Sequence, residues 1–327
     1  MRKSLFLLVT LVFFIVCSKD DLSVEGPVET LKEQREVLKE FYYSTGGDNW
    51  ENIHPDFKWK VNDPTSDLRL WYGLEVNDEG WVIKIDLRWH EHNLTGTIPA
   101  SLGRLHKLEE IWLHDNNLSG AIPDELGKLT KLRVLDLSIN KLLGEIPASL
   151  TNLVQLQELA LHHNKLSGEI PSSIGNLTNL KKLRLSSNEF TGEIPNSLRN
   201  LVNLEILSLG FNHILDTIPA YLGNLNELKT ISLNSNQFSG EIPASLGNLS
   251  QLEYLDLSYN ELSGNIPETF QNLEVMISLM VQGNQLSGKV PEDVVNKIGV
   301  KAREEFRKVI NPQYEKDGKN KGDYLIW

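Results

Sequence analysis

The stretch that decides the fold is Leu132-Arg-Val-Leu135-Asp-Leu137-Ser-Ile-Asn140-Lys-Leu142-Leu-Gly144-Glu-Ile146-Pro147. Its pattern of leucine, asparagine, glycine, isoleucine and proline returns every 24 residues. The asparagine recurs in eight successive units without an insertion or deletion, at Asn116, Asn140, Asn164, Asn188, Asn212, Asn236, Asn260 and Asn284. Self-similarity at a fixed period predicts a solenoid, in which each unit forms one turn of a superhelix.

Each part of the unit has a physical role. Side chains alternate along a strand, so Leu135 and Leu137 point inward while Asp136 points outward. Stacked units then place such strands about 4.8 Å apart in a parallel sheet. The asparagine follows where the chain turns, and its carboxamide both donates and accepts hydrogen bonds. A column of asparagines therefore satisfies the buried polar groups of successive turns.

The pattern LxxLxLxxNxLxGxIP resembles the leucine-rich repeat, and its Gly-x-Ile-Pro ending resembles the plant-type subclass. This resemblance implies an α/β solenoid, a curved superhelix with a parallel sheet on its concave side and helical caps at both ends. We expect about nine repeats over residues 82–291. The fold alone does not define the function, because function depends on the variable positions.

Composition narrows the classes of partner. The chain of 327 residues has 32 Lys and Arg against 44 Asp and Glu, a net charge of −12. This charge argues against nucleic acid as a partner, because binding to phosphates needs clustered basic residues. The only cysteine is Cys17, which excludes an intramolecular disulfide.

The first 17 residues are typical of a signal peptide. Arg2 and Lys3 precede an apolar run over residues 5–16, which is too short to span a bilayer. Cys17 and the following Ser-Lys-Asp-Asp resemble a bacterial lipoprotein signal with an acidic surface-export sequence. The resemblance implies a lipid anchor on Cys17, a tether over residues 18–27, and a location at the outer membrane or cell surface. The alternative is an ordinary secretory signal cut after Ser18, which would release the protein.

Two segments flank the repeats. We expect residues 28–81 to form an N-terminal cap, and residues 292–327 to form a C-terminal cap and tail. The cap should begin with a helix over residues 28–43, and its apolar face is predicted to contain Leu31, Leu38, Phe41 and Tyr42. This segment resembles the N-terminal cap of secreted repeat proteins, and in the plant versions of that cap two cysteines bracket the Trp-x-Gly motif. Here Arg69 and Val76 hold those places, so the cap should depend on packing of Trp50, Trp59, Trp71 and Trp81.

The first repeat is irregular and leaves two registers open. If Gly96, Ile98 and Pro99 set the register, Trp89 and His92 take the usual leucine and asparagine places. The alternative is a two-residue bulge.

Binding residues are expected at the outward positions of the strands and in the turn just before each asparagine. These positions should line the concave face, the usual binding surface of a repeat protein. Exposed aromatic side chains there are typical of binding hot spots. The candidate ligand-binding residues are Trp112, His114, Asp115, Ile139, His162, His163, Phe211, Tyr254 and Tyr259.

No metal or cofactor site is expected. His114 and His162 lie two repeats apart, roughly 10 Å by strand spacing, too far to bind one zinc ion at about 2.0–2.1 Å from each nitrogen. The sequence has no catalytic triad order, phosphate loop or zinc-ligand spacing. Four sequons for glycosylation, at Asn93, Asn117, Asn176 and Asn248, follow from the repeat consensus itself.

These observations favour a secreted or cell-surface, non-catalytic recognition module that binds a protein, peptide or glycan on its concave face. One alternative is a defence or inhibitor protein, or a receptor ectodomain, similar to those of plants. Another is a carbohydrate-active enzyme, with outward carboxylates such as Asp115 and Asp136 as its acids.

Overall fold

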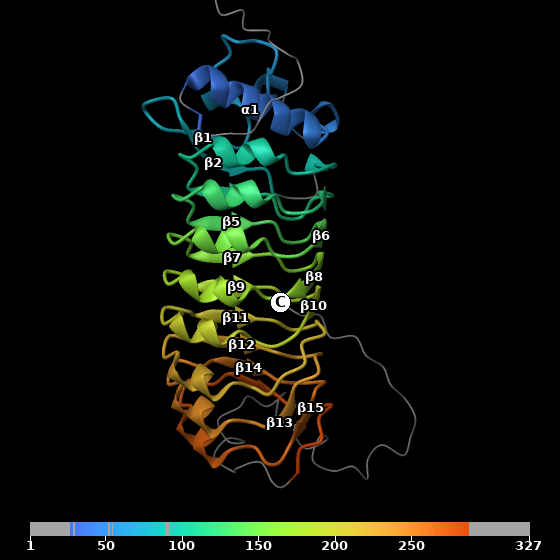
Figure 1. Ribbon diagram of the computed structural model, residues 1–327, viewed down its shortest axis with the longest axis vertical. Helices are drawn as coiled ribbons and strands as arrows, with labels where there is room; N and C mark the ends of the chain where they lie inside the picture. Colours follow the sequence, from blue (N-terminus) through green and yellow to red (C-terminus); the bar gives the residue numbers. More distant parts are fainter. Residues whose placement is uncertain (1–26, 29, 52, 54, 89–91, 288–327) are drawn as a thin grey trace, which may run out of the picture.

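The computed structural model describes residues 27–28, 30–51, 53, 55–88 and 92–287. In this part of the chain, coils of 24 residues stack along one long axis, from helix α1 (Leu31–Ser44) to strand β16 (Ser278–Met280) (Figure 1). Each coil contributes a strand to one main sheet, and a short 3₁₀ helix lies on another side of the stack. The predicted curved solenoid with a parallel sheet is confirmed.

The main sheet has ten strands. They are, in spatial order, β1 (Leu74–Val76), β2 (Val82–Asp86), β3 (Glu110–Trp112), β5 (Val134–Asp136), β7 (Glu158–Ala160), β9 (Lys182–Arg184), β11 (Ile206–Ser208), β12 (Thr230–Ser232), β14 (Tyr254–Asp256) and β16. Only β1 pairs antiparallel, with β2, and the remaining pairs are parallel. From β3 onward, each residue of a strand lies opposite the residue 24 positions later in the next strand, as Leu135 lies opposite Leu159.

A second set of short strands follows the asparagine turns. One sheet contains β4 (Ser119–Gly120), β6 (Lys141–Gly144), β8 (Lys165–Glu169) and β10 (Glu189–Thr191), and another contains β13 (Ser239–Glu241) and β15 (Glu261–Ser263). The gap between these two sheets falls in the coil where Asp216 takes the place of the repeat glycine. In the neighbouring coils this glycine, Gly192 or Gly240, has a positive φ. The Asp216 carboxylate accepts a hydrogen bond from the Ile194 amide at 3.0 Å instead.

The side of each coil after Ile-Pro is a 3₁₀ turn. These turns span Ala100–Arg104, Asp124–Lys128, Ala148–Asn152, Ser172–Asn176, Asn196–Asn200, Ala220–Asn224, Ala244–Asn248 and Glu268–Asn272, and each begins directly after a proline. Proline suits this place because its φ is already fixed near the required value. Gly103 is required by close approach, since a Cβ there would lie 2.1 Å from the Glu125 carbonyl oxygen.

The core is a continuous column of apolar side chains inside the coils. It extends from Val28 to Val281, and the two inward leucines of each central coil, such as Leu159 in β7 and Leu161 directly after it, are fully buried. No single coil encloses its leucines, so each one depends on the coils above and below it.

The N-terminal segment differs in part from the prediction. Helix α1 begins at Leu31, because Thr30 caps it through a reciprocal pair of hydrogen bonds with Glu33. Leu31 is 44% exposed, so its predicted place on the buried face is wrong. Gln34 is buried instead, and its carboxamide bonds to the Gly80 carbonyl and the Val82 amide at the first strand of the stack.

The tryptophans of this segment pack together as expected. Trp50, Trp59 and Trp71 are all buried, and Trp59 lies 5.0 Å from the ring of Trp50 and 5.1 Å from that of Trp71. Trp81 is half-buried beside this core. The predicted C-terminal cap over residues 292–327 lies outside the described residues.

The first repeat contains the two-residue bulge. Ile85 pairs with Ile111, a separation of 26 residues rather than 24. Leu87 therefore takes the inward leucine place and is fully buried, and the register that puts Trp89 there is wrong, although Trp89 itself lies outside the described residues. His92 lies where other coils have asparagine, with its Nδ1 3.2 Å from the Glu51 carbonyl oxygen.

Candidate ligand-binding face

The turn after each strand of the main sheet is held by a ladder of asparagines. The Asn164 Nδ2 donates to the Leu137 carbonyl of the preceding coil at 3.0 Å and to the Leu161 carbonyl of its own coil at 3.1 Å. Its Oδ1 accepts from the Leu142 amide at 2.9 Å. The same pattern recurs at Asn116, Asn140, Asn188, Asn212, Asn236, Asn260 and Asn284. The ladder fixes the backbone that carries the variable residues.

The residue before each ladder asparagine has a left-handed backbone, and we call these residues the left-handed column. Their φ values lie between 53° and 58° at Asp115, Ile139, His163, Ser187, Phe211, Ser235 and Tyr259, and Gly283 ends the column at 71°. This conformation costs a non-glycine residue about 1–2 kcal/mol. It is least suited to a β-branched side chain such as Ile139. Ile139, Phe211 and Tyr259 are nevertheless exposed by 43%, 44% and 60%.

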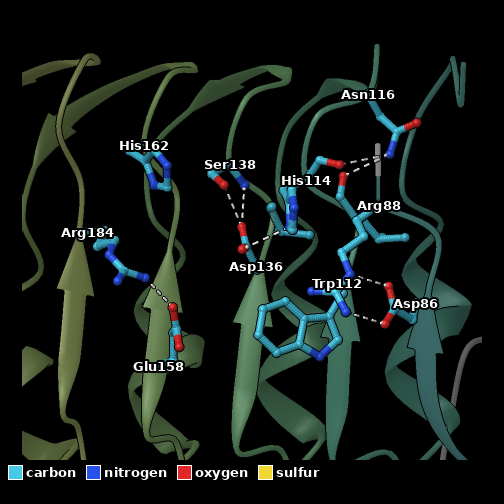
Figure 2. A network of polar contacts seen from close by, with 12 residues as sticks. Asp86, Arg88, Trp112, His114, Asn116, Asp136, Ser138, Glu158, His162 and Arg184 are labelled. Atoms are coloured by element: carbon cyan, nitrogen blue, oxygen red, sulfur yellow. Dashed lines mark hydrogen bonds and ion pairs between the residues drawn. The ribbon is translucent and has the colours of Figure 1, made fainter. Parts of the chain in front are cut away.

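The outward side of the main sheet and the left-handed column together form the concave face. Its N-terminal half, over strands β2 to β9, contains several groups of polar contacts that lie side by side (Figure 2). Arg88 makes a two-point contact with the Asp86 carboxylate, with its Nε 2.9 Å and its Nη2 3.0 Å from the two oxygens. The Arg88 guanidinium also lies 4.9 Å from the ring centre of Trp112, whose Nε1 donates to Glu110. Trp112 is therefore an outward residue that its own chain partly covers.

A histidine–aspartate pair joins this coil to the next one along the face. The His114 Nδ1 lies 3.0 Å from one oxygen of Asp136, while the other accepts from the Ser138 amide at 3.0 Å and from the Ser138 hydroxyl at 2.6 Å. Burial raises the pKa of Asp136, but the hydrogen bonds from His114 and Ser138 outweigh burial. The pKa therefore lies below its ordinary value.

Two further coils complete this half. Glu158 is buried, and it pairs with Lys182 at 2.9 Å and with Arg184. His162 has a buried Nδ1 without a hydrogen-bond partner among the described residues. Desolvation, reinforced by the nearby charges of His163 and Arg184 and opposed by Asp136, lowers the pKa of His162 to about 4. His163 is exposed beside it, with the two rings 5.6 Å apart.

The C-terminal half of the face, over strands β11 to β16, has a different character. Tyr254 begins β14 with 42% exposure, and Tyr259 follows the same strand. Asp256 lies between them and accepts from the Ser258 amide at 3.0 Å and hydroxyl at 2.6 Å. Burial raises the pKa of Asp256 above its ordinary value, although the Ser258 hydrogen bonds oppose the shift.

The structure thus separates the candidate residues into two groups. Trp112, His114, Asp115, Ile139, His162 and His163 lie at the N-terminal half, and Phe211, Tyr254 and Tyr259 lie at the C-terminal half. Sequence reasoning did not select Arg88, Glu158 or Asp256, because charged residues at outward positions are ordinary on a soluble protein. The sequence feature that could have pointed to Asp256 is Asp-Leu-Ser, which two coils share at residues 136–138 and 256–258.

No group of three or more histidine, cysteine, aspartate and glutamate residues within the described ranges is placed to hold a metal ion. In the same part of the chain, no helix is long and apolar enough to cross a membrane.

These features define a class: a repeat solenoid with a constant scaffold and a variable face on its parallel sheet. The family model for the leucine-rich repeat matches residues 106–166, 154–214 and 226–286. The chain belongs to the leucine-rich repeat family, and its repeats are of the plant type. No curated protein matches the sequence.

Solved structures with the same fold include two plant receptors. The ectodomain of the Arabidopsis thaliana receptor kinase GASSHO1/SCHENGEN3, in complex with CASPARIAN STRIP INTEGRITY FACTOR 2, is 34% identical with a TM-score of 0.68, and the match covers 81% of this chain and 34% of that one. The ectodomain of the Arabidopsis receptor kinase HAESA, in complex with a peptide hormone, is 32% identical with a TM-score of 0.71, covering 83% and 45%. This chain therefore spans less than half the length of these relatives.

A third similar structure is a plant ice-binding protein. It is 25% identical with a TM-score of 0.63, and the match covers 80% of this chain and 89% of that one. The same solenoid therefore occurs in proteins of different function.

Proposed function

We propose that the protein is a non-catalytic recognition module that binds a peptide, or an extended segment of a protein, on its concave face. The observation that carries the proposal is the left-handed column, in which Ile139, Phe211 and Tyr259 combine a positive φ with exposure of a large apolar side chain. Backbone strain held at exposed residues is typical of functional sites.

The fold itself does not require these three side chains. Ser187, Ser235 and Gly283 make the same turn with small residues. A glycine relieves the strain altogether, and a polar residue avoids exposing apolar surface. Retaining isoleucine, phenylalanine and tyrosine at these turns is therefore unfavourable for stability in the free protein, and contact with a ligand accounts for it.

A peptide suits the shape of this surface. The column presents its side chains in a line, one coil apart, at about 4.8 Å for each step. Phe211 and Tyr259 are two coils apart with Ser235 between them, so their backbones are separated by roughly 10 Å. An extended chain rises about 3.3 Å for each residue, so side chains on one face of it lie about 6.6 Å apart at i and i+2 and about 13 Å apart at i and i+4, and these two spacings bracket the distance between the two turns. The plant receptors of similar fold were solved with peptide or protein ligands, which supports the proposal.

Selection from a displayed library of random heptapeptides tests the proposal. Wild-type protein should retain a defined set of peptides, and the double variant Phe211→Asn with Tyr259→Asn should lose them. Asparagine is chosen because it tolerates the left-handed backbone. The matched control is Leu215→Asn, which removes an apolar side chain of 63% exposure outside the column. Equal retention by the double variant and wild type would overturn the proposal, as would binding of glycans but no peptides on an array.

The proposal extends to an extracytoplasmic location with a lipid anchor at Cys17. It rests on the sequence of residues 1–21, which lie outside the described residues, and on the similarity to receptor ectodomains. The expected result is that the protein partitions into detergent with the membrane fraction and that Cys17→Ser does not. Mass spectrometry that finds an unmodified mature N-terminus at Lys19 would instead indicate ordinary cleavage and release.

A further inference from the structure

Two coils of the concave face contain the same Asp-Leu-Ser sequence, at residues 136–138 and 256–258. In both, one carboxylate oxygen accepts from the serine amide at 3.0 Å and from the serine hydroxyl at 2.6 Å. The two carboxylates therefore hold the same position relative to their strands. They differ in what reaches the second oxygen.

At Asp136 the second oxygen has a partner from the preceding coil, the His114 Nδ1 at 3.0 Å. The equivalent residue before Asp256 is Asn234. Its Oδ1 accepts from the Ser232 hydroxyl at 2.8 Å and would lie 2.2 Å from a Cβ at Gly210. The Asn234 carboxamide oxygen is therefore directed toward the coil that precedes it, away from Asp256.

The other neighbours of Asp256 supply no positive charge. Ser232 and Met280 lie opposite it on the adjacent strands, Tyr254 begins its own strand, and Ser258 follows that strand two residues later. Lys229 makes its ion pair with Glu205 at 2.8 Å. Among the described residues, the second oxygen of Asp256 has neither a hydrogen-bond donor nor an ion-pair partner.

A half-buried carboxylate without a cation is unfavourable in a free protein. The raised pKa of Asp256 agrees with this arrangement. The exposed rings of Tyr254 and Tyr259 on the same coil add a second attraction for a positive group, because an aromatic face attracts cations.

We propose that Asp256, flanked by Tyr254 and Tyr259, binds a lysine or arginine side chain of the peptide ligand. The ligand's N–H group takes the place that the His114 imidazole takes at Asp136. This inference rests on the proposed function and assigns one ligand residue to the C-terminal half of the face. An apolar residue on the same face of the peptide, two to four positions before or after the basic residue, contacts Phe211, two coils away.

The proposed pair has a defined pH dependence. The cation binds the ionised carboxylate, and binding lowers the pKa of Asp256 from its raised value in the free protein. Affinity should therefore be constant above the pKa of the free protein and fall as the pH drops through it. A ligand in which norleucine replaces the basic residue should not show this fall.

The experiment uses a heptapeptide selected from the random library on the full chain. Its affinity should fall about tenfold or more for Asp256→Asn and by a similar factor when its lysine or arginine is replaced by norleucine. The two changes made together should cost little more than either alone. Glu205→Gln is the matched control, because this carboxylate already has Lys229 as its partner, and affinity should be unchanged.

A second variant copies the pair that His114 forms with Asp136. Asn234→His places an imidazole where His114 stands relative to Asp136. It should lower the pKa of Asp256 below the ordinary value by NMR titration and block the basic peptide. Selected peptides that need Phe211 and Tyr259 but bind Asp256→Asn as tightly as wild type would overturn this inference and leave the proposed function intact. A library from which nothing is retained would overturn both.

Discussion

The two halves of the concave face share one scaffold but arrange their charges in opposite ways. In the N-terminal half, Asp86 pairs with Arg88, Asp136 with His114, and Glu158 with Lys182 and Arg184. In the C-terminal half, Asp256 lies among serine, methionine and tyrosine without a cation. The first half satisfies its charges internally, and the second leaves a carboxylate and three exposed aromatic rings for a partner. A ligand therefore displaces the fewest existing contacts if it binds the C-terminal half.

The comparison depends on both halves having the same core. Leu159 lies in the N-terminal half and Leu255 in the C-terminal half, and both are fully buried. Truncation of either to alanine should cost about 2–5 kcal/mol in the free energy of unfolding. Urea denaturation of the two variants measures this. If the two losses in the free energy of unfolding differ by more than the range expected for such truncations, the two halves do not share one core.

The two aspartates should respond to neutralisation with opposite sign. The folded pKa of Asp136 is lowered, so ionised Asp136 stabilises the fold above its unfolded pKa, and this contribution is lost as the pH falls through the folded pKa. Asp136→Asn should destabilise the protein by about 1–3 kcal/mol at pH 7.

The folded pKa of Asp256 is raised, so its ionisation opposes folding at pH 7. Asp256→Asn should leave the protein as stable as wild type or more stable, by less than about 1 kcal/mol. Thermal unfolding of the two variants at pH 7 provides the test. Equal destabilisation by both would contradict the difference in pairing between the two halves.

A smaller effect is expected from His162. Its pKa in the folded protein is lowered to about 4, whereas the unfolded side chain titrates near its ordinary value of 6.5. The protein should therefore lose stability as the pH falls from about 6.5 towards 4, because the unfolded state binds the proton first. This loss should be absent in His162→Gln. NMR should show a neutral His162 ring at pH 5 while the exposed His163 gives a separate signal. A His162 that titrates at its ordinary value would contradict the burial of its Nδ1.

Much of the fold could be predicted from the sequence, because each repeat has the same residue types at the same positions of its coil. Leu159 and Asn164 have roles fixed by spacing alone, and the structure places both where that spacing requires. Prediction from the sequence was less accurate in the N-terminal segment, before the repeats begin. Leu31 was expected inside the helix interface, but Gln34 lies there, because its carboxamide bonds to the backbone at Gly80 and Val82. Helical periodicity cannot reveal such a polar contact.

The site was predictable to a lesser degree. Spacing identified the outward positions of Phe211, Tyr254 and Tyr259, but it could not show which charged residues pair with one another. The contact between His114 and Asp136 joins neighbouring coils, and its absence at Asp256 depends on the direction of the Asn234 side chain. Such contacts depend on side-chain conformation, which the repeat does not specify.

The left-handed column provides the most direct test of the account, since it separates stability from binding. Tyr259→Asn should unfold at the same temperature as wild type or higher, because asparagine relieves the unfavourable backbone at φ 54°. Its affinity for a library-selected heptapeptide, measured by isothermal titration calorimetry, should fall about tenfold or more. A variant that loses stability but binds with unchanged affinity would contradict the claim that this residue is kept for a ligand.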